Sequence, residues 1–391
     1  MNQILKSLLV LLLLNISISA YEFKEFLANA VETSSFLHSS SMSIEQAHEE
    51  GKKLTRYKNP SLALEVSQFS PDTGSAEKGY RTSYMQAIRL WGVGVDKEHL
   101  AESINSSAKT LYIQNKAKFI RDISLLYTNY SEQIRLVSLA DEAREIAKRI
   151  YEISNARYES GTISRGKMLQ AKIDYEILEI QKGTLLVQSN QSHYKLLKYA
   201  GIDKEITLDE KYKFKIKSAS KYANPDIAYI NAQKKEAISL AKMNSNKIEW
   251  VNLYAEYEKE PNQNIARVGL NVPLALFNTK SEERQIASLE AKKSELLINN
   301  ENKRSNIEIR KLQKERFLLT QVQSKYEKIL KSELELLAMF EDGYKIANIK
   351  LLELQDIKNR VIESKKELIQ IDTALNQNAI YTNYNQGNYN E

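Results

Sequence analysis

The chain of 391 residues contains no cysteine, and it has only 12 glycines and 5 prolines. The absence of cysteine excludes disulfide bonds, thiolate metal sites and a lipid-modified N-terminal cysteine. Glycine and proline supply the turns that large β-rich domains need, so their scarcity argues against an all-β or α/β domain. The composition instead favours a few very long helices, and no linker rich in proline, glycine or serine divides the sequence.

The motifs of common enzymes and metal sites are missing as well. The histidines His38, His48, His99 and His193 lie far apart without zinc-type spacing, so we expect surface roles for them. The sequence has no G-x-S-x-G, no glycine-rich phosphate loop and no H-E-x-x-H. Its formal net charge is +6, but basic and acidic residues interleave and form no basic stripe. We therefore expect no enzymatic activity, no cofactor, no metal site and no nucleic-acid partner.

The N-terminus has the pattern of an export signal. Lys6 supplies a positive start, "LLVLLLLNISI" is an apolar run, and "SISA" ends in small residues at Ala20. The run is too short to span a bilayer as a helix, and no later stretch approaches eighteen apolar residues. These features predict a mature chain that begins near Tyr21, lies outside the cytoplasm and has no transmembrane helix.

The sequence repeats itself. Tyr158-x-x-Gly161-x-Ile163 returns as Tyr344-x-x-Ala347-x-Ile349, and strand-like segments return at a similar lag. Each half is therefore predicted to contain a helix, two strands and one very long helical stretch. The expected segments are a signal peptide (1–20), N-terminal helices (21–58), a β-hairpin (59–92), a long helical hairpin (93–200), a connector with a helix (201–247), a second β-hairpin (248–277), a second helical hairpin (278–380) and a disordered polar tail (381–391).

Four segments of about ten residues alternate between apolar and polar side chains, and this is the length of a membrane-crossing strand. The residues expected to face lipid are Leu62, Leu64, Val66, Val251, Leu253, Val268, Leu270, Val272 and Leu274. The residues expected to face a water-filled lumen are Arg81, Arg89, Glu249, Asn252, Glu256, Arg267 and Asn271.

Four strands cannot close a membrane barrel, because the smallest barrels need about eight. An open sheet edge in lipid leaves backbone groups unpaired at a cost of several kcal/mol each. If the strands lie in a membrane, several copies of the chain must therefore complete the barrel together. The coiled-coil pattern of the long helical stretches would continue the tube into the periplasm, with the change from strand to helix at 277–279.

Taken together, these residues resemble the TolC-type outer-membrane channel family over essentially the whole mature chain. The resemblance rests on the signal peptide, the duplicated plan, "YKNPSLALEV" before the first strand and "RYESGTISRGKMLQA" at a helical turn. The segment "GLNVPLALFNTKSEERQIASLEAKK" is similar to the strand-to-helix segment of the cation-efflux (CzcC-like) branch. The resemblance implies a mainly α-helical homotrimer whose subunits share a 12-stranded membrane β-barrel above a long α-helical barrel.

The resemblance also implies a function and partners. Such a protein is the passive exit duct of a tripartite pump, located in the outer membrane with its helical tube in the periplasm. It docks on a periplasmic adaptor, and a proton-driven inner-membrane transporter supplies the energy. The cation-efflux likeness suggests metal ions or other small molecules as cargo.

Two groups of residues carry over from the family's helix tips. The gate positions are Glu353, Asp356, Tyr344 and Lys167, where Lys167 could pair with Glu353. The adaptor-docking tips are Ser160, Gly161, Thr162, Ile163, Ile346, Ala347, Asn348 and Ile349. Ile349 and Ala347 depart from the family pattern, since the family can carry a basic residue at the first position and usually has glycine at the second.

Other functions fit parts of the sequence. Ordinary exposed helix charges would explain the gate positions equally well, and the tip residues could be plain turns. Within the channel class, the chain could be the duct of a type I protein secretion system. Outside it, a soluble periplasmic coiled-coil scaffold or adaptor with its hairpins in a small β-domain would share the long helices.

Overall fold

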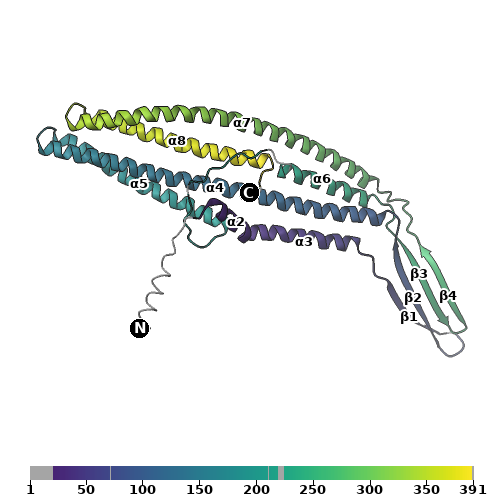
Figure 1. Cartoon of the computed structure of the whole chain (residues 1–391). Helices are drawn as coiled ribbons and strands as arrows, with labels where there is room; N and C mark the ends of the chain where they lie inside the picture. The colour runs from purple at the N-terminus through teal and green to yellow at the C-terminus, as the bar shows by residue number, and fades with distance from the viewer. Residues whose placement is uncertain (1–20, 71, 210, 219–223, 390–391) are drawn as a thin grey trace, which may run out of the picture. The chain divides into compact units, whose positions relative to one another are not determined.

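A computed structural model describes residues 21–70, 72–209, 211–218 and 224–389. The predicted signal peptide, 1–20, lies outside the described residues. The elements are α2 (Phe23–Thr33), α3 (Ser35–Thr55), β1 (Ser61–Phe69), β2 (Glu77–Arg89), α4 (Val93–Glu159), α5 (Arg165–Ala200), α6 (Pro225–Asn244), β3 (Trp250–Glu260), β4 (Gln263–Asn271), α7 (Ser281–Lys345) and α8 (Leu351–Asn385) (Figure 1). The order helix, two strands and two long helices therefore occurs twice, as the repeat predicts.

The chain divides into two compact units. One unit contains the described parts of 1–37, 116–224 and 305–391, and the other contains 38–115 and 225–304. The long helices α4 and α7 each contribute to both. Among the described residues, no helix combines the length and the apolar character that crossing a bilayer requires.

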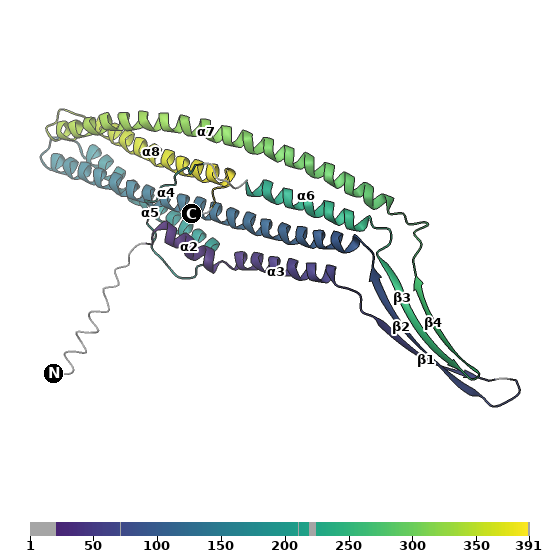
Figure 2. The same ribbon diagram turned by 45° about the vertical axis from the view of Figure 1, so that its right-hand side comes forward.

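The second unit contains one four-stranded antiparallel sheet in the order β1-β2-β3-β4 (Figure 2). The register pairs Glu65 with Arg81, Arg81 with Glu258, and Glu256 with Arg267. β1 and β4 are the edge strands, with one neighbour each inside the chain. The mainly helical fold with four strands is thus confirmed.

The last strand is shorter than the alternation predicts. β4 ends at Asn271, and 272–280 has no regular structure before α7 begins. Pro273 explains the early end, because proline has no N–H to donate to a strand ladder. Val272 and Leu274, which were predicted on the lipid face of the strand, therefore lie beyond its end. Glu249, which was predicted to face the lumen, lies one residue before β3 begins.

The first unit is built on the helical hairpins α4–α5 and α7–α8, and it has two apolar cores. One core surrounds Phe23, Tyr127 and Phe214, whose rings lie 4.5 Å to 6.3 Å apart. The other core, near the hairpin turns, includes Ile150 and Leu354. The helical members of both cores come from apolar stripes on one side of each helix, whereas Leu208 and Phe214 come from the segment between α5 and α6.

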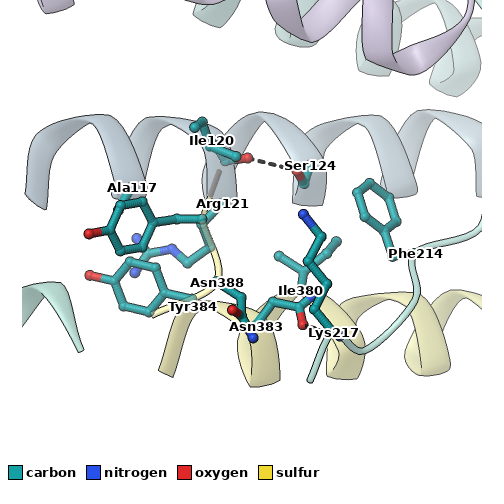
Figure 3. Close-up of a pocket in the computed structure, with 11 residues that line it drawn as sticks. Ala117, Ile120, Arg121, Ser124, Phe214, Lys217, Ile380, Asn383, Tyr384 and Asn388 are labelled. Atoms are coloured by element: carbon teal, nitrogen blue, oxygen red, sulfur yellow. Dashed lines mark hydrogen bonds between the residues drawn. The ribbon is translucent and has the colours of Figure 1, made fainter. Parts of the chain in front are cut away.

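The C-terminal segment is packed rather than disordered, which corrects the sequence prediction for 381–391 as far as residue 389. α8 continues to Asn385. The Asn383 amide accepts from Lys217 N at 2.9 Å and donates to Lys215 O at 2.9 Å, and Asn388 donates to Ser218 O at 2.8 Å. These asparagine amides give an extended segment the hydrogen bonds that a neighbouring strand would supply. Figure 3 shows Asn383 and Asn388 beside Lys217, around a small cavity of about 40 Å³.

Candidate functional site

One face of the sheet is apolar and open to its surroundings. Leu64 and Val66 on β1 are 73% and 79% exposed, and Val268 and Leu270 on β4 are 78% and 64% exposed. Alternation and register place these side chains on the same face as the other strand residues predicted to face lipid, Leu62, Val251 and Leu253. A contiguous exposed apolar face of this kind marks a surface that contacts lipid or another protein.

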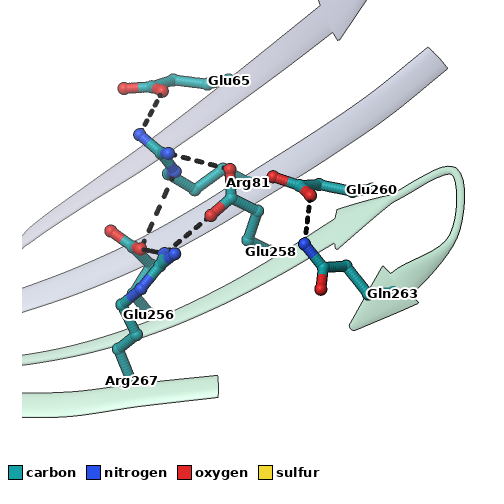
Figure 4. A network of polar contacts seen from close by, with 7 residues as sticks. All are labelled: Glu65, Arg81, Glu256, Glu258, Glu260, Gln263 and Arg267. Carbon is teal, nitrogen blue, oxygen red and sulfur yellow. Dashed lines mark hydrogen bonds and ion pairs between the residues drawn. The ribbon is translucent and has the colours of Figure 1, made fainter. Parts of the chain in front are cut away.

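The opposite face carries charge. Arg81 contacts Glu65 at 3.3 Å, Glu258 at 2.8 Å and Glu256 at 3.8 Å. Arg267 pairs with Glu258 at 2.6 Å and also with Glu256 (Figure 4). Among the predicted lumen residues, Asn252 and Asn271 pair in register on this same face. Glu65 alternates with the apolar residues of β1, so the sequence also predicts it on this face. Glu258 was missed, although its two-residue spacing from Glu256 is a signal that could have identified it.

At the other end of the sheet, Arg89 holds the end of a helix. Its Nη2 donates to Thr55 O at 2.9 Å and to Arg56 O at 2.8 Å, at the C-terminus of α3. Its guanidinium also lies 4.6 Å from the Tyr57 ring centre and 4.9 Å from that of Trp250. Arg89 therefore satisfies carbonyls that a helix end leaves unpaired, while its guanidinium lies against two rings that contact each other edge-on, 5.8 Å apart. Glu249, just before β3, pairs with Lys97 of α4.

Both helical hairpins turn with the same hydrogen-bond pattern. Thr162 N donates to Arg157 O at 2.8 Å and Gly161 N to Tyr158 O at 2.9 Å. The second turn repeats these bonds from Asn348 N and Ala347 N to the carbonyls of 343 and 344. Each turn is thus a Schellman motif, in which the residue after the helix adopts the left-handed conformation. The φ angles of Gly161 and Ala347, 74° and 67°, agree.

The predicted docking residues lie at these two turns. Ser160, Gly161, Thr162, Ile346, Ala347 and Asn348 are exposed. Ile163 and Ile349 are half-buried. Ile349 packs against Gly343, where an added Cβ would lie 2.5 Å from Ile349 Cγ1. Ile346 is the apolar side chain that the second turn exposes most, at 68%.

Behind the turns, Tyr344 joins the two hairpins. Its hydroxyl lies 2.9 Å from Ser154 Oγ, and its carbonyl accepts from Arg157 Nη1 at 2.8 Å. The Arg157 guanidinium also covers the Tyr344 ring at 4.7 Å. Because Tyr344 is only 1% exposed, these bonds are protected from competition by water. Tyr344, predicted at the gate, therefore links α7 to α4 inside the protein.

Comparison with known proteins gives similarity of structure but not of sequence. No known protein family matches the sequence, and no curated relative does. One solved structure is that of CusC, described in connection with folding and transmembrane channel formation. It superposes with a TM-score of 0.76 at 13% sequence identity, and the match covers 93% of this chain and 91% of CusC. The CmeC outer-membrane channel of Campylobacter jejuni gives 0.73 at 14% identity, with coverage of 94% and 86%. The outer-membrane protein VceC of Vibrio cholerae gives 0.75 at 13% identity, with coverage of 93% and 95%.

The chain has the fold of TolC-type outer-membrane channels. These neighbours are membrane channel proteins rather than enzymes. At such identities the likeness concerns the fold, and the cation-efflux branch stays a resemblance of sequence alone.

Within this TolC-type fold, the other predicted gate residues have local partners. Glu353 accepts from Lys350 N at 3.0 Å and so caps the start of its own helix, α8. Asp356 pairs with Arg360 one helical turn away, at 2.9 Å, and both side chains are mostly exposed. The partner that Glu353 has here is thus a backbone N–H of its own helix. The pairing of Lys167 with Glu353 stays a prediction.

A second link between the hairpins was not predicted. Lys358 of α8 is 1% exposed and pairs with Asp174 of α5. Gln170 and Gln355 bridge the same two helices at 3.3 Å. Burying a lysine is costly unless it is paired, so this contact fixes α5 against α8 near the turns. Lys358 is one of three lysines in α8, and it follows Leu354 and precedes Val361 at the 4,3 spacing of the buried stripe. That spacing is the signal that could have identified it as buried.

Proposed function

We propose that the chain is the outer-membrane exit duct of an efflux system, a passive channel whose energy comes from a partner pump. The sheet would contribute to a membrane barrel. The hairpins α4–α5 and α7–α8 would form the walls of a periplasmic tube. The outer-membrane channels among the structural neighbours support this general role.

The observation that carries the proposal is the two-sided sheet. Its apolar face exposes Leu64, Val66, Val268 and Leu270, while its other face holds the ion pairs of Arg81 and Arg267. A water-soluble domain would bury the apolar face against a core. A barrel wall needs the opposite arrangement, with the apolar face toward lipid and the charged face toward water.

The edges of the sheet support a shared barrel. β1 and β4 are open edges, and an open edge in lipid leaves backbone N–H and C=O groups unpaired. Pairing β4 of one copy with β1 of the next removes every edge when the ring closes. We propose a homotrimer with 12 strands, following the family resemblance.

The helical turns would be the gate and the docking site. We propose that the tube is narrowed at the end where Tyr344, Glu353 and Asp356 lie, with Lys167 on the facing helix. The exposed turns at 160–163 and 346–349 would meet a periplasmic adaptor. A proton-driven inner-membrane transporter would supply the energy, and the cargo would be small molecules or metal cations.

The experiment places a cation on the apolar face. Leu270→Arg is expected to impair assembly in the outer membrane, because arginine on the lipid face is costly, by about 2–4 kcal/mol at the bilayer midplane and by less toward the membrane surfaces. The matched control is Asn271→Arg, which puts the same side chain on the opposite face one residue away. Membrane fractions washed with high salt are probed for the chain, and export is measured in the same cells.

Two outcomes contradict the proposal. Normal insertion and export by Leu270→Arg would show that the face assignment is wrong. Release of the parent chain by the salt wash would favour the soluble periplasmic scaffold instead.

A further inference from the structure

The hairpin end of the sheet's charged face holds an excess of negative charge. Five carboxylates and two guanidiniums of the strands lie on this face by alternation and register, which leaves three net negative charges per chain. We call this group the acidic belt. Its members are Glu65, Glu77, Glu256, Glu258, Glu260, Arg81 and Arg267. Figure 4 shows all of them except Glu77. Glu77 and Glu260 also line one hollow of about 480 Å³ at the hairpin end.

The helix end of the same face holds an excess of positive charge. Arg89, Lys58 and Lys97 gather on the Trp250 ring, with their charged groups 4.9 Å, 5.1 Å and 5.6 Å from its centre. In the part of the chain that the structure describes, the carboxylate paired with these three cations is Glu249, which binds Lys97. We call Lys58, Arg89 and Lys97 the basic belt, and with Glu249 included it has two net positive charges per chain.

An uncharged stretch separates the two belts. From Glu256 to Trp250 the strand advances six residues, or about 20 Å at the usual rise of about 3.3 Å per residue. The strand residues of this face between the belts are uncharged: Ser61, Met85, Ala87, Asn252, Tyr254, Gly269 and Asn271. The distance is about twice the Debye length of about 10 Å at 0.1 M salt. Each belt therefore acts on ions as a separate zone at that salt concentration.

We propose that the two belts make the duct rectify ion current, which rests on the proposed function of the chain as a channel. A narrow passage with negative walls concentrates cations, and one with positive walls concentrates anions. When the hairpin side is positive, cations and anions both move toward the stretch between the belts, where they accumulate and raise the conductance. The opposite voltage empties this stretch of both ions and lowers the conductance.

The same arrangement limits the return of charged solutes. An anion that enters from the hairpin side meets the acidic belt first. A cation that passes this belt meets the basic belt next. An ion of either charge thus meets one belt that repels it on the way in. Cargo that moves outward also crosses both belts, but a pump supplies the energy for that step.

The test is the current through the reconstituted full-length channel at equal positive and negative voltages, in 0.1 M and 1 M KCl. The parent and a Tyr344→Phe variant are both recorded. The variant lacks the hydroxyl that contacts Ser154, so we expect it to loosen the proposed gate. The resistance of the helical turns then does not mask the effect of the sheet on the current. Ser75→Cys in the β1–β2 turn, labelled from one side by an impermeant thiol reagent, identifies the hairpin side, because the chain has no other cysteine.

The charge variant is the double substitution Glu65→Lys and Glu77→Lys, which changes the acidic belt from three negative charges to one positive charge per chain. The Glu65 side chain is 61% exposed, and its ion pair with Arg81 is long, at 3.3 Å. The matched control is Gln68→Lys, which adds a lysine near the hairpin end but on the apolar face.

We expect the parent to pass more current in 0.1 M KCl when the hairpin side is positive. This asymmetry should be lost in 1 M KCl, where the Debye length is about 3 Å. It should also be lost in the double variant and kept in Gln68→Lys. A symmetric parent, or an asymmetry that survives the double variant, overturns the two-belt inference while the channel stands. A folded, membrane-inserted oligomer without any conductance removes both.

Discussion

Ala347 adopts a backbone conformation that glycine adopts without cost. Its φ of 67° nearly equals that of Gly161 at the corresponding position of the other hairpin, and the two turns share their hydrogen bonds. In the left-handed region the Cβ of an L-residue crowds the following carbonyl, at a cost of about 1–2 kcal/mol. The second turn therefore stores strain that the first turn lacks.

Exchanging the two residues tests this strain. Gly161→Ala is expected to destabilise the first turn by about 1 kcal/mol, since no atom lies within 4 Å of an added Cβ and only the backbone is strained. Ala347→Gly is expected to leave the second turn equally stable or to stabilise it slightly, because glycine also has more unfolded conformations to lose. Amide hydrogen exchange at Thr162 and Asn348 reports each turn. Equal losses in both variants would contradict the argument.

His193 is buried, which corrects the surface role expected for it. It is 8% exposed, its ring lies 5.0 Å from that of Tyr130, and its Nδ1 has no hydrogen-bond partner among the described residues. It lies at a groove of about 590 Å³ that Glu205 also lines. Burial lowers the pKa of the His193 imidazole, and the nearby Glu205 carboxylate opposes part of that shift.

This shift predicts a dependence of stability on pH. Because the folded-state pKa of His193 lies below its unfolded value, the folded state favours the neutral ring. The stabilisation is present above the unfolded pKa and is lost as the pH falls below it. We expect the unfolding midpoint of the parent in detergent to fall more between pH 7 and pH 5 than that of His193→Gln. Parallel falls would mean that His193 does not contribute.

At the scale of elements, the ion pairs near the hairpin turns are of two kinds, exposed and buried. Asp356 and Arg360 form an exposed pair within one helix, and such pairs contribute about 0–1 kcal/mol. Lys358 and Asp174 join two helices, and the lysine is 1% exposed. The buried pair therefore decides how firmly α5 and α8 hold together.

Removing one member of the buried pair gives the element-scale prediction. Asp174→Asn leaves the Lys358 ammonium without its partner and is expected to cost about 3 kcal/mol, the low end for a broken buried pair, because Asp174 is partly exposed. If these hairpins form the gate, the conductance of the reconstituted channel also rises. Thermal unfolding and single-channel records measure the two effects.

The double substitution Asp174→Leu and Lys358→Met is the matched control. Apolar side chains of similar length can replace a buried ion pair with little loss, so this variant should regain most of the stability. A double variant as unstable as Asp174→Asn would show that packing at these positions, rather than an unpaired charge, is responsible.

The type of an element was predictable from the sequence where its hydrophobic period repeats many times. The end of an element was harder to predict where a single residue determines it. The long apolar stripes of α4 and α7 and the alternation in β1 to β4 indicated the element types. The end of β4 depends on Pro273, and the alternation continues past it as far as Leu276. Long-range partners such as Lys358 and Asp174 lie 184 residues apart, and no local pattern relates them.

At the scale of the whole molecule, the sheet has an even number of strands and two open edges. β1 and β4 run in opposite directions because each neighbouring pair is antiparallel. Copies of the chain can thus pair β4 with the next β1 and keep the sheet antiparallel throughout. Such a contact joins two different surfaces, and it generates a ring when the rotation closes.

Cysteine pairs across this seam test the closed assembly. Residues that pair across a sheet share a face, so Ala63→Cys on β1 should crosslink with a cysteine on the charged face of β4. Position 265, 267 or 271 is substituted in turn, so that the three variants sample different registers between copies. Oxidation is expected to give covalent dimers and trimers on denaturing gels for at least one pair, without background from native cysteines. Leu64→Cys, which faces the apolar side, is the control and should give none with the same β4 positions. Two outcomes would contradict closure through β1 and β4. One is equal crosslinking from Ala63→Cys and Leu64→Cys. The other is no crosslinking from either position together with a mass in detergent that equals one chain.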